Sequence, residues 1–251
     1  MLEHVAVIMP ALNEADAIGV TLAEIFAVTK RTGGTNADFA RATDYGGPTD
    51  IRQLIVVDNG SSDQTAQVAR DLGVEVVREP RRGYGSACLA GIAALRPEIT
   101  TIVFLDADGS DDPRDMARLL EPIARGDAEM VLASRVTGQR EPGALSRQQQ
   151  FGNAVATSLM RMIAGMRYTD LGPFRAIRRP ALERLQMRDT NYGWTIEMQI
   201  KAKREGLRVL EIPANYRRRR GGKSKVSGTL SGAVLAGGKI LWTIARHAAR
   251  P

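Results

Sequence analysis

The sequence has one cysteine, few aromatic residues and no long apolar run. Because Cys88 stands alone among 251 residues, no disulfide can form within the chain, which is compatible with a reducing compartment. No uninterrupted apolar stretch is long enough to cross a bilayer, and the short apolar run that ends at Pro10 does not resemble a secretory signal. We therefore expect a globular cytoplasmic protein without a spanning helix.

The chain is strongly basic, with a net charge of +7 and a sequence pI of about 9.9. Such a charge suits nucleic acid, an anionic membrane or phosphorylated small molecules. The densest basic run is Arg217–Arg220, followed by Lys223 and Lys225. Aromatic residues make up only 5% of the chain and Tyr216 alone adjoins this run, which disfavours a nucleic-acid-binding domain. A solvated face stays open, but we favour contacts with phosphates and membrane headgroups.

Short β-branched segments alternate with helical patterns. We predict strands at 4–10, 51–58, 74–79, 100–106, 128–134, 174–179 and 208–217, and helices at 15–29, 61–73, 85–95, 145–164 and 194–206, with a further helix beginning at Pro113. Repeated strand–helix units predict an α/β fold with a mostly parallel sheet, in which ligands bind at the carboxyl ends of the strands. The polar, glycine-rich segment 31–50 is predicted to be a loop or insertion.

Four aspartates follow the fourth predicted strand, in the stretch VFLDADGSDDP at 103–113. Asp106 and Asp108 are separated by one residue, so in an extended chain their side chains point the same way. Two carboxylates on one side suit Mg²⁺ or Mn²⁺, with substrate phosphates completing the coordination. Asp111 and Asp112 directly precede Pro113, and for them we favour a role in capping the next helix.

Polar residues also follow the other predicted strands. Asn13 and Glu14 can bind a ligand or cap the next helix, and capping is the simpler interpretation for this pair. Asp58 can equally cap a turn or accept from a base or ribose. Gly83 and Gly85 let backbone N–H groups approach a phosphate or form an ordinary loop. Arg135 can bind phosphate or be solvated. A nucleotidyltransferase would carry a Gly-rich basic loop after the first strand, where this chain has PALNE.

The motifs PALNE, VVDNGSSDQT, GYGSACLAGI, LDADGSDDP and ASR occur here in the order and spacing of family 2 glycosyltransferases with the GT-A fold, which the chain resembles. The later LGPFRAIRR, YGWTIEMQIKA and EIPANYRRRRGGKSK resemble the polyprenyl-phosphate sugar synthases, of the dolichol-phosphate mannose synthase type. The resemblance covers nearly the whole chain except 31–50 and the last twenty or so residues.

The resemblance implies roles for individual residues. It implies a nucleotide-sugar site formed by Pro10, Ala11, Asn13, Glu14, Asp58, Gly83, Asp106 and Asp108. It implies a metal site at Asp106 and Asp108, with Ser110 at the position where mannose synthases often have a longer glutamine ligand. It implies charge stabilisation during catalysis by Asp108, Arg135, Arg219 and Lys225, and acceptor binding by Arg219, Ser224 and Lys225.

The expected reaction moves a hexose from a nucleotide sugar, of the GDP-mannose or UDP-glucose type, to polyprenyl phosphate with inversion, assisted by Mg²⁺ or Mn²⁺. A soluble or glycolipid hydroxyl is the alternative acceptor. A hydroxyl would need a base, for which Glu197 and Asp170 are the candidates, although a surface carboxylate and a turn cap are the simpler interpretations of the two.

The expected organisation is a GT-A domain over 1–228, with a nucleotide-sugar half at about 1–135 and an acceptor half at about 136–228. Residues 229–251 are expected to form an amphipathic helix. This helix would lie on the inner face of the membrane as a peripheral contact, or pack on the core or on a partner subunit, so homo-oligomerisation stays open.

Overall fold

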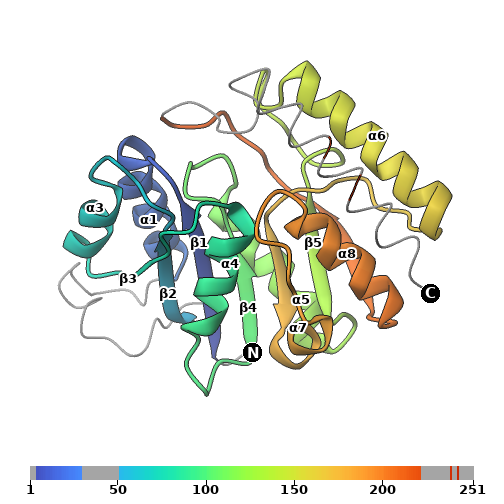
Figure 1. Ribbon diagram of the computed structural model, residues 1–251, viewed down its shortest axis with the longest axis horizontal. Helices are drawn as coiled ribbons and strands as arrows, with labels where there is room; N and C mark the ends of the chain where they lie inside the picture. Colours follow the sequence, from blue (N-terminus) through green and yellow to red (C-terminus); the bar gives the residue numbers. More distant parts are fainter. Residues whose placement is uncertain (1–3, 30–50, 222–237, 239–241, 243–251) are drawn as a thin grey trace.

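A computed structural model of the protein describes residues 4–29, 51–221, 238 and 242 (Figure 1). The predicted insertion at 31–50, the predicted amphipathic helix at 229–251, and the candidate acceptor residues Ser224 and Lys225 therefore fall outside the described residues, apart from the two isolated positions. Within the described part, no helix combines the length and the apolar character that crossing a bilayer requires.

The centre of the fold is a sheet of seven strands in the order β3-β2-β1-β4-β6-β5-β7. The strands are β1 (Val5–Ala11), β2 (Ile51–Asp58), β3 (Glu75–Arg78), β4 (Thr101–Phe104), β5 (Met130–Ser134), β6 (Arg175–Arg178) and β7 (Val209–Pro213). Neighbouring strands are parallel except at β6, which is antiparallel to both β4 and β5. The prediction of a mostly parallel sheet is confirmed.

Helices cover both faces of this sheet (Figure 1). They are α1 (Ala15–Thr29), α3 (Thr65–Asp71), α4 (Tyr84–Ala93), the short 3₁₀ helix η1 (Pro113–Asp115), α5 (Met116–Arg125), α6 (Arg147–Ala164), α7 (Arg179–Leu185) and α8 (Trp194–Arg204). Alternate residues of β1 show the division, because Val7 packs with the helices α1 and α5 whereas Ile8 packs with α4, α7 and α8. The result is a three-layer α/β fold.

Local sequence signals explain where several elements begin and end. Asp112 caps η1 by accepting a hydrogen bond from the backbone N–H of Arg114 at 3.0 Å, which confirms its predicted capping role. Gly73, with a φ of 75°, follows α3 in the left-handed conformation that suits glycine. Ser146 and Gln149 form a reciprocal capping box that begins α6.

Candidate active site

The carboxyl ends of β1, β2, β4 and β5 bring most of the predicted polar residues to one edge of the sheet. Ala11, the last residue of β1, pairs in register with Asp58, the last residue of β2. The loop after β4, residues 105–112, carries the four aspartates and is called the aspartate loop below. The edge therefore gathers acidic groups from three neighbouring strands, as parallel topology requires.

Asp106 and Asp108 have different surroundings in the aspartate loop. Asp108 Oδ1 accepts hydrogen bonds from the backbone N–H and the hydroxyl of Ser110, at 2.9 and 2.6 Å. Asp106 Oδ1 is buried and has no hydrogen-bond partner within the described part of the chain. Burial, followed by the charges of Asp108 and Asp111, raises the pKa of Asp106 well above its usual value. The surroundings of the Asp106 carboxylate therefore favour a partner that neutralises its negative charge.

Asp111 belongs to this acidic group rather than to the helix cap. Its residue is 2% exposed, and its Oδ2 atom has no hydrogen-bond partner among the described residues. Burial and then the charge of Asp108 raise the pKa of Asp111 to about 7. The predicted capping role for Asp111 is therefore corrected, because Asp112 alone makes the cap hydrogen bond at η1.

The carboxylate oxygens of this acidic group are of the kind that bind divalent cations. Among the described residues, no three carboxylate, histidine or cysteine side chains are already arranged around a common metal position. Asp106 and Asp111 nevertheless each present a buried carboxylate oxygen without a hydrogen-bond partner in the resolved segments. Hard oxygen ligands of this kind, few in number, are typical of Mg²⁺ and Mn²⁺ sites that substrate phosphates complete.

Arg219 joins two of the predicted nucleotide-sugar residues. Its Nη1 atom lies 2.6 Å from Asp108 Oδ2, and its Nη2 atom pairs with the carboxylate of Glu14. Its Nε atom also donates to the carbonyl of Gly221 at 2.9 Å. Arg219 therefore already occupies a position between two acidic groups at the sheet edge, where a bound cation or a basic side chain is needed to offset their charge.

The backbone around Arg219 fixes this arrangement. We call residues 217–220 the arginine segment. The N–H of Arg217 donates to the carbonyl of Ser110 at 2.8 Å, and the N–H of Arg220 donates to the carbonyl of Asp108 at 3.0 Å. The side chains of Arg217 and Arg220 both pair with Glu24 on α1. Part of the predicted basic surface is thus neutralised by the protein's own carboxylates.

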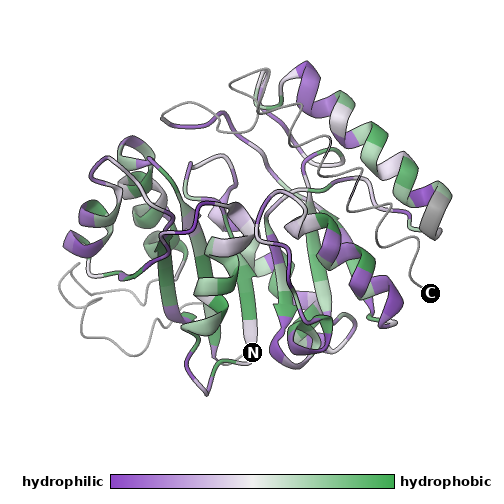
Figure 2. Cartoon of the chain, in the orientation of Figure 1, coloured by the Kyte–Doolittle hydropathy of each residue, from purple (hydrophilic) through white to green (hydrophobic). Residues whose placement is uncertain are grey.

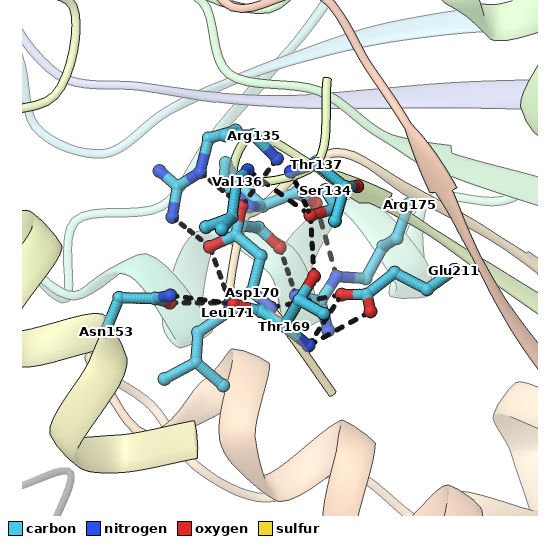
Figure 3. A network of polar contacts seen from close by, with 12 residues as sticks. Ser134, Arg135, Val136, Thr137, Asn153, Thr169, Asp170, Leu171, Arg175 and Glu211 are labelled. Atoms are coloured by element: carbon cyan, nitrogen blue, oxygen red, sulfur yellow. Dashed lines mark hydrogen bonds and ion pairs between the residues drawn. The ribbon is translucent and has the colours of Figure 1, made fainter. Parts of the chain in front are cut away.

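Arg135 is held at the end of β5 by Asp170 (Figure 3). The Asp170 carboxylate accepts from Arg135 Nε, Nη2 and backbone N–H at 2.7, 2.7 and 2.8 Å. The guanidinium also lies over the ring of Tyr216, 5.2 Å from its centroid. Burial pushes the pKa of Asp170 upward, but the hydrogen bonds and charge of Arg135 outweigh it and lower that pKa. A low pKa and bonded oxygens make Asp170 a poor general base.

Glu197, the other candidate base, is also engaged inside the protein. Its carboxylate accepts the backbone N–H of Asp189 at 2.7 Å and that of Arg188 at 3.1 Å, and it pairs with Lys201 at 2.7 Å. The residue is only 3% exposed, so the interpretation as a surface carboxylate is wrong. Its observed contacts hold the 188–191 segment in place.

Comparison with known proteins shows the family to which the chain belongs. The family model described as glycosyl transferase family 2 matches residues 6–186. The chain belongs to this family. The glycosyltransferase is 36% identical over 237 residues to an uncharacterized glycosyltransferase of Mycobacterium tuberculosis, with 93% of this chain and 94% of that relative covered. It is 32% identical over 192 residues to the polyprenol monophosphomannose synthase of Mycolicibacterium smegmatis, with 70% and 71% covered.

Solved structures confirm the GT-A fold of the glycosyltransferase. Glucosyl-3-phosphoglycerate synthase from Mycobacterium tuberculosis, in complex with Mn²⁺, UDP and glucosyl-3-phosphoglycerate, superposes with a TM-score of 0.75 at 19% identity. The superposition covers 99% of this chain and 81% of that structure. The predicted family, fold class and enzymatic nature are therefore confirmed.

The loops that follow β1 and β2 in the glycosyltransferase are joined by hydrogen bonds. Asn13 Oδ1 accepts the backbone N–H of Ser62 at 2.8 Å, and the backbone N–H of Asn13 donates to the hydroxyl of Ser61 at 3.0 Å. Asp58 Oδ1 accepts the N–H of Ser61 at 3.1 Å. Asn13 and Asp58 therefore shape the ends of β1 and β2, and neither caps α1 through its side chain in these contacts. Their nucleotide contacts, with those of Pro10 and Ala11, stay predictions.

The glycines before α4 fit against the enzyme's own chain. A Cβ atom at Gly83 would lie 2.1 Å from the carbonyl oxygen of Thr190, and one at Gly85 would lie 2.0 Å from that of Asp189. The N–H of Ser86 donates to the same Thr190 carbonyl, and the N–H of Gly83 donates to Asn59 Oδ1. The absence of a side chain at these glycines allows the 189–191 segment to pack closely against them. A phosphate contact at Gly83 stays a prediction.

Several functional contacts were not predicted from the sequence. Tyr216 stacks on Arg135, Glu24 pairs with the arginine segment, and Asn59 holds the loop after β3 through the carbonyls of Glu79 and Arg81. No local pattern identifies such partners, since they lie on different elements.

Proposed function

We propose that the protein transfers a hexose from a nucleotide sugar to polyprenyl phosphate, with inversion and with the help of a divalent cation. The observation that carries this proposal is a contrast at one sheet edge. The aspartate loop has buried carboxylate oxygens without hydrogen-bond partners in the described chain. In contrast, the carboxylates of both candidate bases, Asp170 and Glu197, accept hydrogen bonds from other residues of the protein. The unpartnered oxygens suit a cation that binds a diphosphate, and neither of the two bases predicted from the sequence is free to deprotonate a hydroxyl.

The donor would bind at the ends of β1, β2 and β4. Asp106 and Asp108 are the residues that would hold Mg²⁺ or Mn²⁺, with Ser110 contributing through its hydrogen bonds to Asp108. When bound, the cation would act as a Lewis acid that offsets charge on the departing diphosphate. Structural neighbours crystallised with Mn²⁺ and UDP support this choice. Pro10, Ala11, Asn13, Glu14, Asp58 and Gly83 would surround the nucleotide.

Positive side chains would stabilise the leaving group. Arg135 is fixed by Asp170, and Arg219 reaches the aspartate loop directly. Fixed charges are effective where negative charge develops, because no reorganisation is needed during the reaction. Lys225 is proposed for the same role from the sequence alone. In a single displacement, the acceptor oxygen bonds to the anomeric carbon as the bond from that carbon to the diphosphate breaks, which inverts the configuration.

The acceptor class is inferred from the state of the two bases predicted from the sequence, Asp170 and Glu197, whose carboxylates are both engaged in internal hydrogen bonds. A lipid phosphate is already anionic near neutral pH, so its oxygen can attack without a proton acceptor. The relatives named polyprenol monophosphomannose synthase and dolichyl-phosphate hexose transferase support the same acceptor class. Arg219, Ser224 and Lys225 are the proposed contacts to that phosphate. We propose that the enzyme meets this acceptor as a peripheral protein at the inner face of a membrane.

The test is a donor screen with purified full-length enzyme. GDP-mannose and UDP-glucose are each incubated with polyprenyl phosphate in detergent and either Mg²⁺, Mn²⁺ or a chelator. We expect one donor to yield a glycosylated lipid phosphate that requires the cation. Asp108→Asn should abolish this product, whereas Asp112→Asn, a matched change in the same loop, should retain it. Transfer only to a sugar hydroxyl would contradict the acceptor, and full activity of Asp108→Asn would contradict the metal assignment.

A further inference from the structure

Helix α6 is apolar on two sides, and the rest of the described chain covers only one of them. The inner side packs through Ala156 and Met160 against Ile196 and Ile200 of α8. Phe151 and Met162 are 72% and 78% exposed on the same helix. A solvated helix normally carries one apolar stripe, facing the core, so the second stripe needs its own explanation.

The exposed apolar residues form a continuous stripe. At about 100° per residue, Phe151, Val155 and Met162 fall within about 40° of one another around the helix axis. We call these three residues the outer face of α6. Figure 2 shows apolar residues along this helix, which lies at the border of the molecule beside α8. Scattered exposed apolar residues are ordinary, but an aligned row on one helix indicates a binding surface.

The charge around the outer face has one sign. From residue 142 to residue 169 the sequence contains no aspartate or glutamate, and it carries Arg147, Arg161 and Arg167. By helical geometry Arg147 and Arg161 lie along one flank of the outer face. A helix with an apolar row of Phe and Met flanked by arginines and free of acidic groups matches the composition of helices that lie in a membrane interface.

We propose that the outer face of α6 docks on an anionic lipid surface. The partner must supply apolar contact and negative charge together, which lipid headgroups and acyl chains do. A second copy of α6 would instead bring arginine to arginine without a carboxylate. The C-terminal segment 229–251 carries the wrong charge as well, because it contains Lys239, Arg246 and Arg250 and no acidic residue. Charge complementarity therefore selects the membrane.

Docking at α6 would place the candidate active site beside the lipid surface. On its inner side, Asn153 of α6 donates to the carbonyl of Thr169 and accepts the N–H of Leu171, next to Asp170 (Figure 3). Just before α6, Glu141 accepts the backbone N–H of Arg218 in the arginine segment at 2.7 Å. The helix and the residues just before it are thus anchored both beside Asp170 and at the arginine segment. A lipid surface bound to α6 would therefore lie at a fixed distance from the candidate active site.

The test measures vesicle binding by the full-length protein without donor or acceptor. Sedimentation with phosphatidylcholine vesicles containing phosphatidylglycerol is compared with pure phosphatidylcholine. The variant Phe151→Ser with Met162→Ser should lower the partition coefficient for the anionic vesicles by about tenfold or more, since two large apolar side chains lose burial. The control Val20→Ser removes a residue 45% exposed on α1 and should bind as wild type does. Arg147→Gln with Arg161→Gln should remove most of the preference for anionic vesicles.

Three results would overturn the docking proposal. The wild-type protein fails to bind anionic vesicles, or the double serine variant binds as well as wild type, or ultracentrifugation shows a dimer that this variant alone dissociates. Thermal unfolding of the variants checks that the exposed changes leave the fold intact. The vesicles contain no polyprenyl phosphate, so failure of the proposed acceptor would show in the donor screen and would leave vesicle binding unaffected.

Discussion

Arg219 lies between Asp108 and Glu14, and its guanidinium pairs with both carboxylates. Asp108 is in the aspartate loop after β4, and Glu14 directly precedes α1. The two acidic groups belong to different strand ends, and a side chain from the far end of the chain joins them. The same guanidinium that would stabilise a departing diphosphate therefore also balances the two acidic groups.

Replacing Arg219 should change metal binding and turnover in opposite directions. Arg219→Gln frees the Asp108 oxygen that now accepts from the guanidinium, so Mn²⁺ titrated without donor should bind several times more tightly. Turnover should nevertheless fall by about 10²-fold or more, because a fixed positive charge near the leaving group is lost. Calorimetric Mn²⁺ titration and steady-state kinetics measure the two effects. Arg218→Gln is the control, since Arg218 donates through Nε to the carbonyl of Pro142. Equal losses in both variants would refute a specific role.

Asp106→Asn should leave the protein folded while removing cation-dependent turnover. Burial disfavours the charge of Asp106, so the neutral amide should not lower the free energy of unfolding, whereas kcat should fall by about 10²-fold or more. Urea unfolding and turnover at saturating Mn²⁺ give the two quantities. Unchanged kcat, with unchanged Mn²⁺ dependence, would show that the cation is held elsewhere.

Asp170→Asn tests whether this carboxylate supports the fold or acts as a base. Removing its charge leaves Arg135 buried without a counter-ion, which should cost about 3 kcal/mol or more in the free energy of unfolding. The exposed pair of Glu121 and Arg125 provides the comparison, and Glu121→Gln should cost no more than about 0.5 kcal/mol. A base would show the reverse pattern, with unfolding unchanged and a steep loss of kcat that depends on pH.

Two glycines should respond to alanine with opposite signs. At Gly85 the new Cβ would lie 2.0 Å from the Asp189 carbonyl, so the 188–191 segment must shift, and stability should fall by about 2 kcal/mol. At Gly152 on α6 a Cβ meets nothing within 4 Å, and alanine should stabilise the helix by about 0.5–1 kcal/mol. Urea denaturation of both variants is the measurement, and a stabilised Gly85→Ala would show that the 188–191 segment is not packed there.

Tyr168 should make the protein lose stability in alkali. Burial raises the pKa of Tyr168 to about 12 in the folded protein, whereas tyrosine in the unfolded chain ionises near 10. The unfolded state therefore ionises first, so the contribution of Tyr168 is complete below about pH 10 and is lost between about 10 and 12. Urea unfolding across this range should show a weaker pH dependence for Tyr168→Phe, with a difference of about 2.7 kcal/mol at most. Identical slopes would mean that Tyr168 ionises normally in the fold.

Much of the sheet could be predicted because each strand signals itself locally. The strand at Ile51–Asp58 and the helix at Ala15–Thr29 match the predicted bounds, since buried runs and caps are local features. The direction of β6 could not be read from Arg175–Arg178, because four residues of strand carry no mark of their orientation. Strand direction is set by which neighbours the chain meets after folding.

The position of the polar side chains at the strand ends could be predicted from the sequence, but their contacts with other parts of the protein could not. Asp106 and Asp108 were recognisable from their spacing after a buried strand. Glu197 was not recognisable as a buried anchor, because its partners are backbone N–H groups of a preceding loop. Arg217 likewise gave no sign of pairing with Glu24, which comes from the first helix of the chain.

The arginine segment has a consequence for the order in which the protein assembles. The arginine segment follows β7 in the sequence, and its backbone forms hydrogen bonds with the aspartate loop. These hydrogen bonds therefore join parts of the chain that are far apart in the sequence. Long-range closure of this kind is slow and follows local structure. A nascent chain that ends after β7 has all the strands of the described sheet, yet it lacks the Arg219 guanidinium that pairs with Asp108 and Glu14. The acidic edge of the sheet is therefore balanced by Arg219 only after the seven strands of the described sheet have been synthesised.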